Sequence, residues 1–130
     1  KVVRSSRSDQ ATIVGAGVTL HEALKAHAVL QAEGINVRVI DAYSVKPIDV
    51  RTLTAAATET GQVIVVEDHF WDGGIGDAVL NAIGNQAAVH KIAVRTVARS
   101  GSPEELIEAC GIGAGKIAER VREVVGANKN

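Results

Sequence analysis

Short apolar segments alternate along this chain with longer stretches that have the spacing of amphipathic helices. Four such segments lie at residues 11–14, 35–40, 62–66 and 89–97. Connections of a dozen or more residues between strands are typical of parallel pairing with a helical crossover. We therefore predict an α/β fold in which a mostly parallel sheet is covered by helices on both faces. Residues 1–4 offer a further strand.

Turn and cap residues set the expected helix boundaries. Thr19 with Glu22 has the spacing of a capping box, so we expect Glu22 on the polar side of a helix that Gly34 ends. Asp49 can cap a second helix, which Gly61 ends. The apolar side of the first helix is expected to hold Leu20, Ala23, Leu24, His27, Ala28 and Leu30.

The C-terminal third reads as two helices. The Ser102-Pro103 pair followed by two glutamates predicts a helix start, with proline at the first helical position. We expect this short helix to stop at Gly111 and a last amphipathic helix to cover about 115–125. The domain is thus predicted at 11–125, after a polar lead-in at 1–10 and before a frayed tail at 126–130.

Composition narrows the class of protein. The chain has 130 residues, enough for one domain with its own core, and 46% of them are hydrophobic while 2% are aromatic. Its 14 basic and 15 acidic residues are interspersed, so we expect neither nucleic acid nor membrane as a partner. A single cysteine and the absence of a run of ~20 apolar residues favour a cytoplasmic protein.

The segment after residue 66 is the best candidate contact site. It contains two of the three aromatic residues and a cluster of glycines, and such loops usually contact another molecule. Its candidate contact residues are Glu67, His69, Phe70, Trp71, Gly73, Gly74 and Gly76.

Four carboxylates in the same segment raise the alternative of acid–base chemistry. They are Glu67, Asp68, Asp72 and Asp77. Structural roles explain them equally well, with Asp77 capping the next helix and Glu67 binding loop N–H groups. No second acid cluster accompanies them, so we favour a docking surface over catalysis.

A dinucleotide site is the other interpretation that we considered. Gly15 and Gly17 follow a strand and precede a helix, and Asp41 lies where a ribose contact would be expected. The third glycine of that motif would fall at Leu20, which favours a plain tight turn.

The sequence favours neither a metal site nor a reactive thiol. His21 and His27 lie six positions apart, outside ligand spacing on a helix, and His27 is expected in the core. His90 lies at a strand start, and His69 has the best setting of the histidines because it lies in the glycine loop. Cys110, at an expected helix end, lacks the environment that activates a thiolate.

Four segments together resemble the C-terminal domain of transketolases, particularly the animal type. They are Asp9-Gln-Ala-Thr-Ile-Val-Gly-Ala-Gly-Val-Thr-Leu-His-Glu-Ala-Leu24, Ser44-Val-Lys-Pro-Ile-Asp49, Val66-Glu-Asp-His-Phe-Trp-Asp-Gly-Gly-Ile-Gly-Asp-Ala-Val79 and Val97-Ala-Arg-Ser-Gly-Ser-Pro-Glu-Glu-Leu-Ile107. The resemblance implies a three-layer α/β/α domain with a five-stranded mixed, mostly parallel sheet.

The resemblance also implies a parent enzyme that moves a two-carbon ketol unit from a ketose phosphate to an aldose phosphate. In that family thiamine diphosphate and Mg²⁺ are bound by the two preceding domains, so none of the residues in this chain receives a catalytic, cofactor or metal role. The implied partners are those catalytic domains, or a subunit that carries them, and a second copy in a homodimer.

Two classes remain open at this point. The chain is either a non-catalytic portion of such an enzyme, cut from a longer polypeptide or made as a separate subunit, or a free-standing nucleotide- or metabolite-binding module that uses the Gly15 or Gly73 loop.

Overall fold

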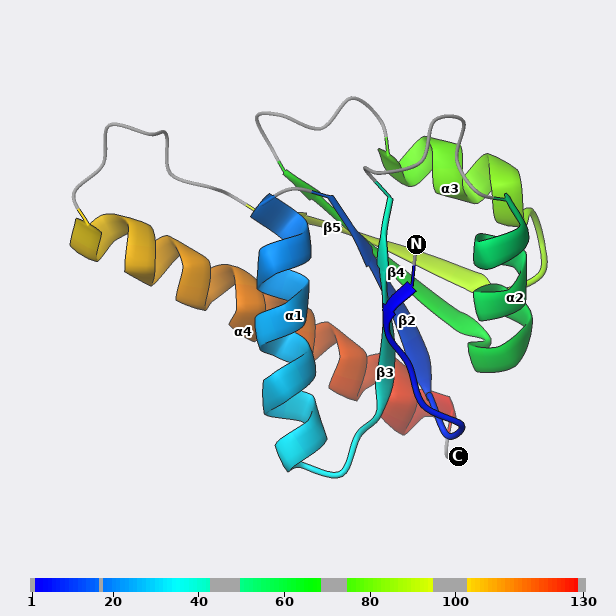
Figure 1. The fold of residues 1–130 in the computed structure, drawn as a ribbon, viewed down its shortest axis with the longest axis horizontal. Helices are drawn as coiled ribbons and strands as arrows, with labels where there is room; N and C mark the ends of the chain where they lie inside the picture. Colours follow the sequence, from blue (N-terminus) through cyan, green and yellow to red (C-terminus); the bar gives the residue numbers. More distant parts are fainter. Residues whose placement is uncertain (1, 17, 43–49, 69–74, 95–102, 129–130) are drawn as a thin grey trace.

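The computed structural model describes residues 2–16, 18–42, 50–68, 75–94 and 103–128 (Figure 1). The residues between these ranges lie outside the described part of the chain. The elements in chain order are β1 (Val2–Arg4), β2 (Ala11–Gly15), α1 (Val18–Ala32), β3 (Val37–Asp41), α2 (Val50–Thr60), β4 (Gln62–Asp68), α3 (Ile75–Ile83), β5 (Ala88–Val94) and α4 (Pro103–Asn128).

Within the described ranges, five strands form one mixed sheet in the order β1-β3-β2-β4-β5. β2, β3, β4 and β5 are parallel, and Ile13 of β2 pairs with Val39 on one side and Ile64 on the other. β1 is antiparallel to β3, which confirms the expected edge strand near the N-terminus. β4, the most continuous apolar segment, lies in the interior of the sheet between β2 and β5.

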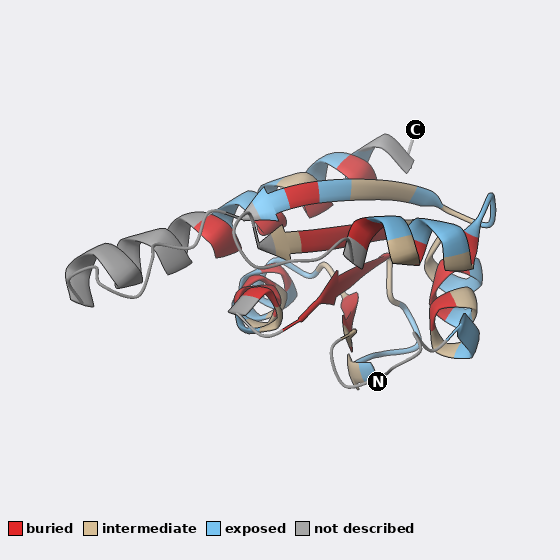
Figure 2. Ribbon diagram, turned by 90° about the horizontal axis from the view of Figure 1, so that it is seen from above, coloured by how far each residue is buried: buried red, intermediate tan, exposed pale blue. Residues whose placement is uncertain are grey.

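Helices cover both faces of the sheet, so the domain has the predicted α/β/α layers (Figures 1 and 2). α1 and α4 pack on one face, where Leu30 and Ile117 join Ile64 in one buried cluster. α2 and α3 pack on the other face, where Leu53 and Val79 belong to a second cluster. Neighbouring residues in a strand point to opposite faces. A strand that is covered on both faces can therefore be apolar without interruption, as in the buried run Val63, Ile64, Val65 and Val66.

Glycines end the first two helices as the sequence predicts. Gly34 follows α1 with φ +83° and Gly61 follows α2 with φ +73°, a region that glycine adopts without strain. The next strand follows shortly after each turn, β3 after Gly34 and β4 after Gly61.

An ion network joins the lead-in segment to the domain. Arg38 of β3 donates from Nε to Asp9 at 3.1 Å, and its other guanidinium nitrogens contact Glu59 of α2. The hydrogen bond to Glu59 raises the pKa of Arg38. The side chain of Asp9 is only 1% exposed. The sequence did not indicate this network, because its three members lie far apart along the chain.

Three expectations for α1 are wrong. Ala28 is exposed, while Glu22 is fully buried rather than on the polar side of the helix. α4 packs along α1 and covers Glu22, whose Oε1 accepts a hydrogen bond from the Ala114 backbone N–H at 3.1 Å. Thr19 does not cap the helix, because α1 begins one residue earlier and the Thr19 hydroxyl bonds back to Ala16.

The expected break in the C-terminal helical region is also wrong. α4 runs from Pro103 to Asn128 as one helix, so it passes through Gly111 and includes the start of the expected frayed tail. The expected start at Pro103 is confirmed. Packing of Ile117 and Val121 against the sheet stabilises the second half, which outweighs the low helix propensity of the glycines.

Candidate functional site

The predicted contact segment begins where β4 ends and finishes at the start of α3. Because β2, β3, β4 and β5 are parallel, this segment lies at the carboxyl edge of the sheet, where α/β domains commonly bind other molecules. Residues 69–74 lie outside the described part of the chain, and with them His69, Phe70, Trp71, Gly73 and Gly74. The structure describes the two flanking members of the set, Glu67 and Gly76.

Glu67 binds the first turn of α3. Its Oε1 atom accepts a hydrogen bond from the Gly76 backbone N–H at 2.7 Å. A carboxylate at a helix start satisfies an N–H group that has no partner inside the helix and interacts favourably with the helix dipole. Of the two roles considered for Glu67, the structural one therefore has direct geometric support.

Gly76 is buried against two side chains. A Cβ atom there would lie 2.5 Å from Glu67 Oε1 and 3.0 Å from Cδ and Cε of Lys91. Any side chain at this position would displace the carboxylate, so this contact requires glycine.

Asp77 does not cap α3, because the helix begins at Ile75 and Asp77 lies in its first turn. Its carboxylate instead pairs with Lys91 of β5 at 2.6 Å. The hydrogen bond between them lowers the pKa of Asp77 and raises the pKa of Lys91. Both groups are exposed, so the pair fixes geometry more than it stabilises the fold.

These contacts occupy the start of α3. An anion that approached the Gly76 N–H would have to displace Glu67 and would also meet the charge of Asp77. The Glu67–Gly76 hydrogen bond and the Lys91–Asp77 ion pair thus join β4, α3 and β5 at the ends of the predicted contact segment.

Backbone N–H groups at the Gly15 turn also have hydrogen-bond partners within the protein. A Cβ atom on Gly15 would lie 2.9 Å from the backbone of Thr19 and Leu20, so the strand and the helix meet very closely there. The Ala16 N–H donates to the Thr19 hydroxyl at 2.8 Å, and the Thr19 N–H donates to the Ala16 carbonyl at 3.2 Å. The geometry agrees with a tight turn rather than a phosphate cradle.

The described histidines do not form a cluster. His21 is exposed, whereas burial lowers the pKa of both His27 and His90. His90 Nε2 shares a hydrogen bond with Gln62 Oε1 at 2.8 Å, a partner that the sequence did not indicate. Among the residues that the structure describes, no group of three or more His, Cys, Asp or Glu side chains could hold a metal ion.

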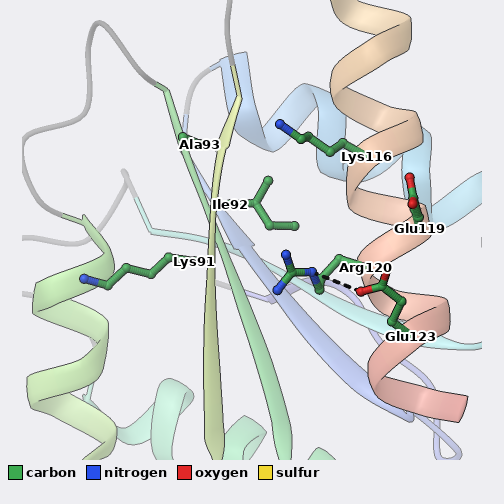
Figure 3. A pocket seen from close by; sticks show the side chains of 7 residues that line it. All are labelled: Lys91, Ile92, Ala93, Lys116, Glu119, Arg120 and Glu123. Carbon is green, nitrogen blue, oxygen red and sulfur yellow. Dashed lines mark ion pairs between the residues drawn. The ribbon is translucent and has the colours of Figure 1, made fainter. Parts of the chain in front are cut away.

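A groove of about 270 Å³ lies between β5 and α4, away from the predicted segment (Figure 3). Ile92 forms its floor, and Lys116 and Arg120 project from α4 beside it, while Lys91 points away toward α3. Arg120 pairs with Glu123, so the lining is a mixture of both charges rather than a cationic pocket. The sequence does not indicate this groove, because its two sides, β5 and α4, are distant along the chain.

The fold is a three-layer α/β domain, and in the described part of its carboxyl edge the turns are held by hydrogen bonds and an ion pair within the protein. The family model "Transketolase, C-terminal domain" matches residues 1–117. The chain belongs to this family.

Relatives agree with that assignment. The chain is 48% identical to mouse transketolase-like protein 2 and 45% identical to human transketolase, over 128 residues in each case. These matches cover 96% of this chain and 20% of each relative, so the chain spans about a fifth of their length. In the described ranges, none of the helices combines the length and apolar character that a membrane span needs.

Solved structures share the fold. A split gene transketolase, described as an inactive beta4 tetramer, superposes with a TM-score of 0.76 at 34% identity, covering 97% of this chain and 42% of that one. A transketolase from Campylobacter jejuni superposes with a TM-score of 0.57 at 16% identity, covering 94% of this chain and 18% of that one.

Proposed function

We propose that the chain is the C-terminal structural and dimer-supporting domain of a transketolase. The complete enzyme would transfer a two-carbon ketol unit reversibly from a ketose phosphate to an aldose phosphate in the pentose phosphate pathway of the cytoplasm. The observation that carries the proposal is the family match over residues 1–117, combined with relatives of which this chain spans about a fifth.

Thiamine diphosphate and Mg²⁺ would be bound by domains other than this one. Among the described residues, the start of α3 faces Glu67 and Asp77, whose negative charges oppose a diphosphate. The Ala16 N–H at the Gly15 turn already has the Thr19 hydroxyl as its partner. These residues do not fit the cofactor, and we assign them no step of the reaction.

The aromatic–glycine segment, residues 67–76, is proposed as the contact with the catalytic portion of the enzyme. Its described ends lie at the carboxyl edge of the sheet, where the Gly76 N–H donates to Glu67 and Lys91 pairs with Asp77, next to Gly76. A contact surface on a rigid support loses less conformational freedom when it binds. The partner would be the preceding domains or a subunit that carries them, and two such units would form a homodimer.

Reconstitution tests the proposal. We would read the gene upstream of Lys1, produce the polypeptide encoded there, and mix it with this chain in the presence of thiamine diphosphate and Mg²⁺. We expect the two parts to sediment as one species, with ketol transfer in the complex. Failure to associate, together with an upstream sequence that encodes no cofactor-binding domains, would contradict the proposal.

A further inference from the structure

The Glu22 carboxylate is fully buried at the junction of α1 and α4 and is only partly satisfied. Oε1 accepts the Ala114 N–H, and Lys25 Nζ lies 3.5 Å from Oε2. Oε2 is buried and has no hydrogen-bond partner among the described residues. Burying a carboxylate oxygen without a hydrogen bond costs free energy, so a further hydrogen-bond donor would stabilise this site.

The N–H group that Glu22 binds lies in the middle of α4. In an uninterrupted α-helix the Ala114 N–H would donate to the carbonyl four residues earlier, that of Cys110. A side chain that inserts into this hydrogen-bond ladder is one of the few causes of a sharp helix bend.

The sequence around Ala114 has the lowest helix propensity in α4. Gly111, Gly113 and Gly115 occupy three of five consecutive positions, and each glycine disfavours a helix by about 1 kcal/mol relative to alanine. The second half of α4 is held independently, because Ile117 and Val121 lie in the core.

We propose that residues 111–115 form a joint at which α4, a single helix in this structure, bends in solution, while Glu22 caps the docked second half. When the helix bends, the N–H groups of Ala114, Gly115 and Lys116 lose their partners within the helix. The Oε2 atom of Glu22 has an ion pair with Lys25 but no hydrogen-bond partner among the described residues, so it has the capacity to accept one of them. The first half of α4 then changes direction while the half that follows the joint stays on the sheet.

Gly115 gives a clean test of the joint. A Cβ atom on Gly115 meets no atom within 4 Å, so Gly115→Ala changes helix propensity without a clash. Gly126→Ala is the matched control, since Gly126 lies in the same helix, away from the joint, and a Cβ there also meets no atom within 4 Å.

Amide hydrogen exchange on the 130-residue chain is the measurement, with each rate compared to the amides of residues 118–125. We expect the amides of residues 113–116 to exchange faster than this reference. Gly115→Ala should slow them about fivefold, the equivalent of the propensity difference, and Gly126→Ala should leave them unchanged. Equal protection on both sides of residues 111–115, or equal effects of the two alanine variants, would overturn the joint.

Amide hydrogen exchange also tests the capping role of Glu22. Glu22→Ala removes the cap, so we expect residues 114–116 to exchange at least fivefold faster relative to the reference, as for the loss of a helix N-cap. Glu22→Gln keeps an oxygen acceptor and should restore part of the protection. If the exchange rates at these amides do not depend on residue 22, the capping role is overturned. If Glu22→Ala does not fold, the Gly115→Ala comparison still decides whether the joint exists.

Discussion

The Oε1 atom of Glu67 lies 2.7 Å from the backbone nitrogen of Gly76, so the end of β4 binds the start of α3 through a single carboxylate. Both residues belong to the segment that the sequence marks as a contact site. Their bond fixes the two ends of that segment and uses a helix N–H that could otherwise bind an anion.

Gly76→Ala tests how tightly this corner is packed. The added Cβ would lie 2.5 Å from Glu67 Oε1, the end of a flexible side chain that would have to move, so we expect the variant to lose the Glu67 hydrogen bond and about 1 kcal/mol of unfolding free energy. Urea denaturation measures the loss, with Gly126→Ala as a control that adds a Cβ in open space. Equal stability of the two variants would mean that the corner is loosely packed.

Arg38→Met should destabilise the domain strongly. The substitution removes the charge that partners the buried Asp9 carboxylate, and loss of one partner from a buried ion pair costs about 3–5 kcal/mol. Arg122→Met is the matched control, because Arg122 of α4 pairs with Glu33 in the turn after α1, and such an exposed pair contributes little to stability. Similar midpoints in urea would show that burial of the Arg38 network is unimportant.

Stability should fall as the pH drops below about 6.5, because burial lowers the pKa of His27 and His90 from the ordinary value of 6.5. The unfolded chain then binds protons that the folded chain does not, so the stability contributed by the neutral rings is present above pH 6.5 and is lost as the pH falls toward the folded pKa values. Thermal melts from pH 8 to pH 5 measure the slope.

Replacement of His27 and His90 by glutamine should flatten that slope. His21→Gln, at an exposed position, should leave it unchanged. A slope that survives the first pair of substitutions would assign the pH dependence to other groups.

The sequence predicts much of the fold for local reasons. The apolar run from Val63 to Val66 indicates a buried strand, and Gly34 and Gly61 end helices because they adopt positive φ. Hydrophobic spacing and turn chemistry are properties of neighbouring residues, so they can be read without a structure.

Long-range contacts explain what the sequence could not predict. Thr19 and Glu22 have capping-box spacing, yet Glu22 accepts its hydrogen bond from Ala114, 92 positions away. The same holds for Arg38 with Asp9 and Glu59. Within the candidate site, the sequence left two roles open for Glu67, acid–base chemistry and a structural role. The contact role of His69, Phe70 and Trp71 remains a prediction, because these residues lie outside the described part of the chain.

The double substitution Phe70→Ala with Trp71→Ala should leave the domain folded and weaken its association with the catalytic portion. Large aromatic side chains dominate binding energy at protein interfaces, so we expect at least a tenfold rise in the dissociation constant. Sedimentation of the mixed parts measures it. Unchanged assembly with the variant would remove this segment from the interface.

The central claim is that this domain supports a transketolase without performing its chemistry. The most direct test is to incubate the pure 130-residue chain with thiamine diphosphate, Mg²⁺, a ketose phosphate and an aldose phosphate, and to measure two-carbon transfer. We expect transfer only when the catalytic portion is added, and turnover by the chain alone would contradict the account.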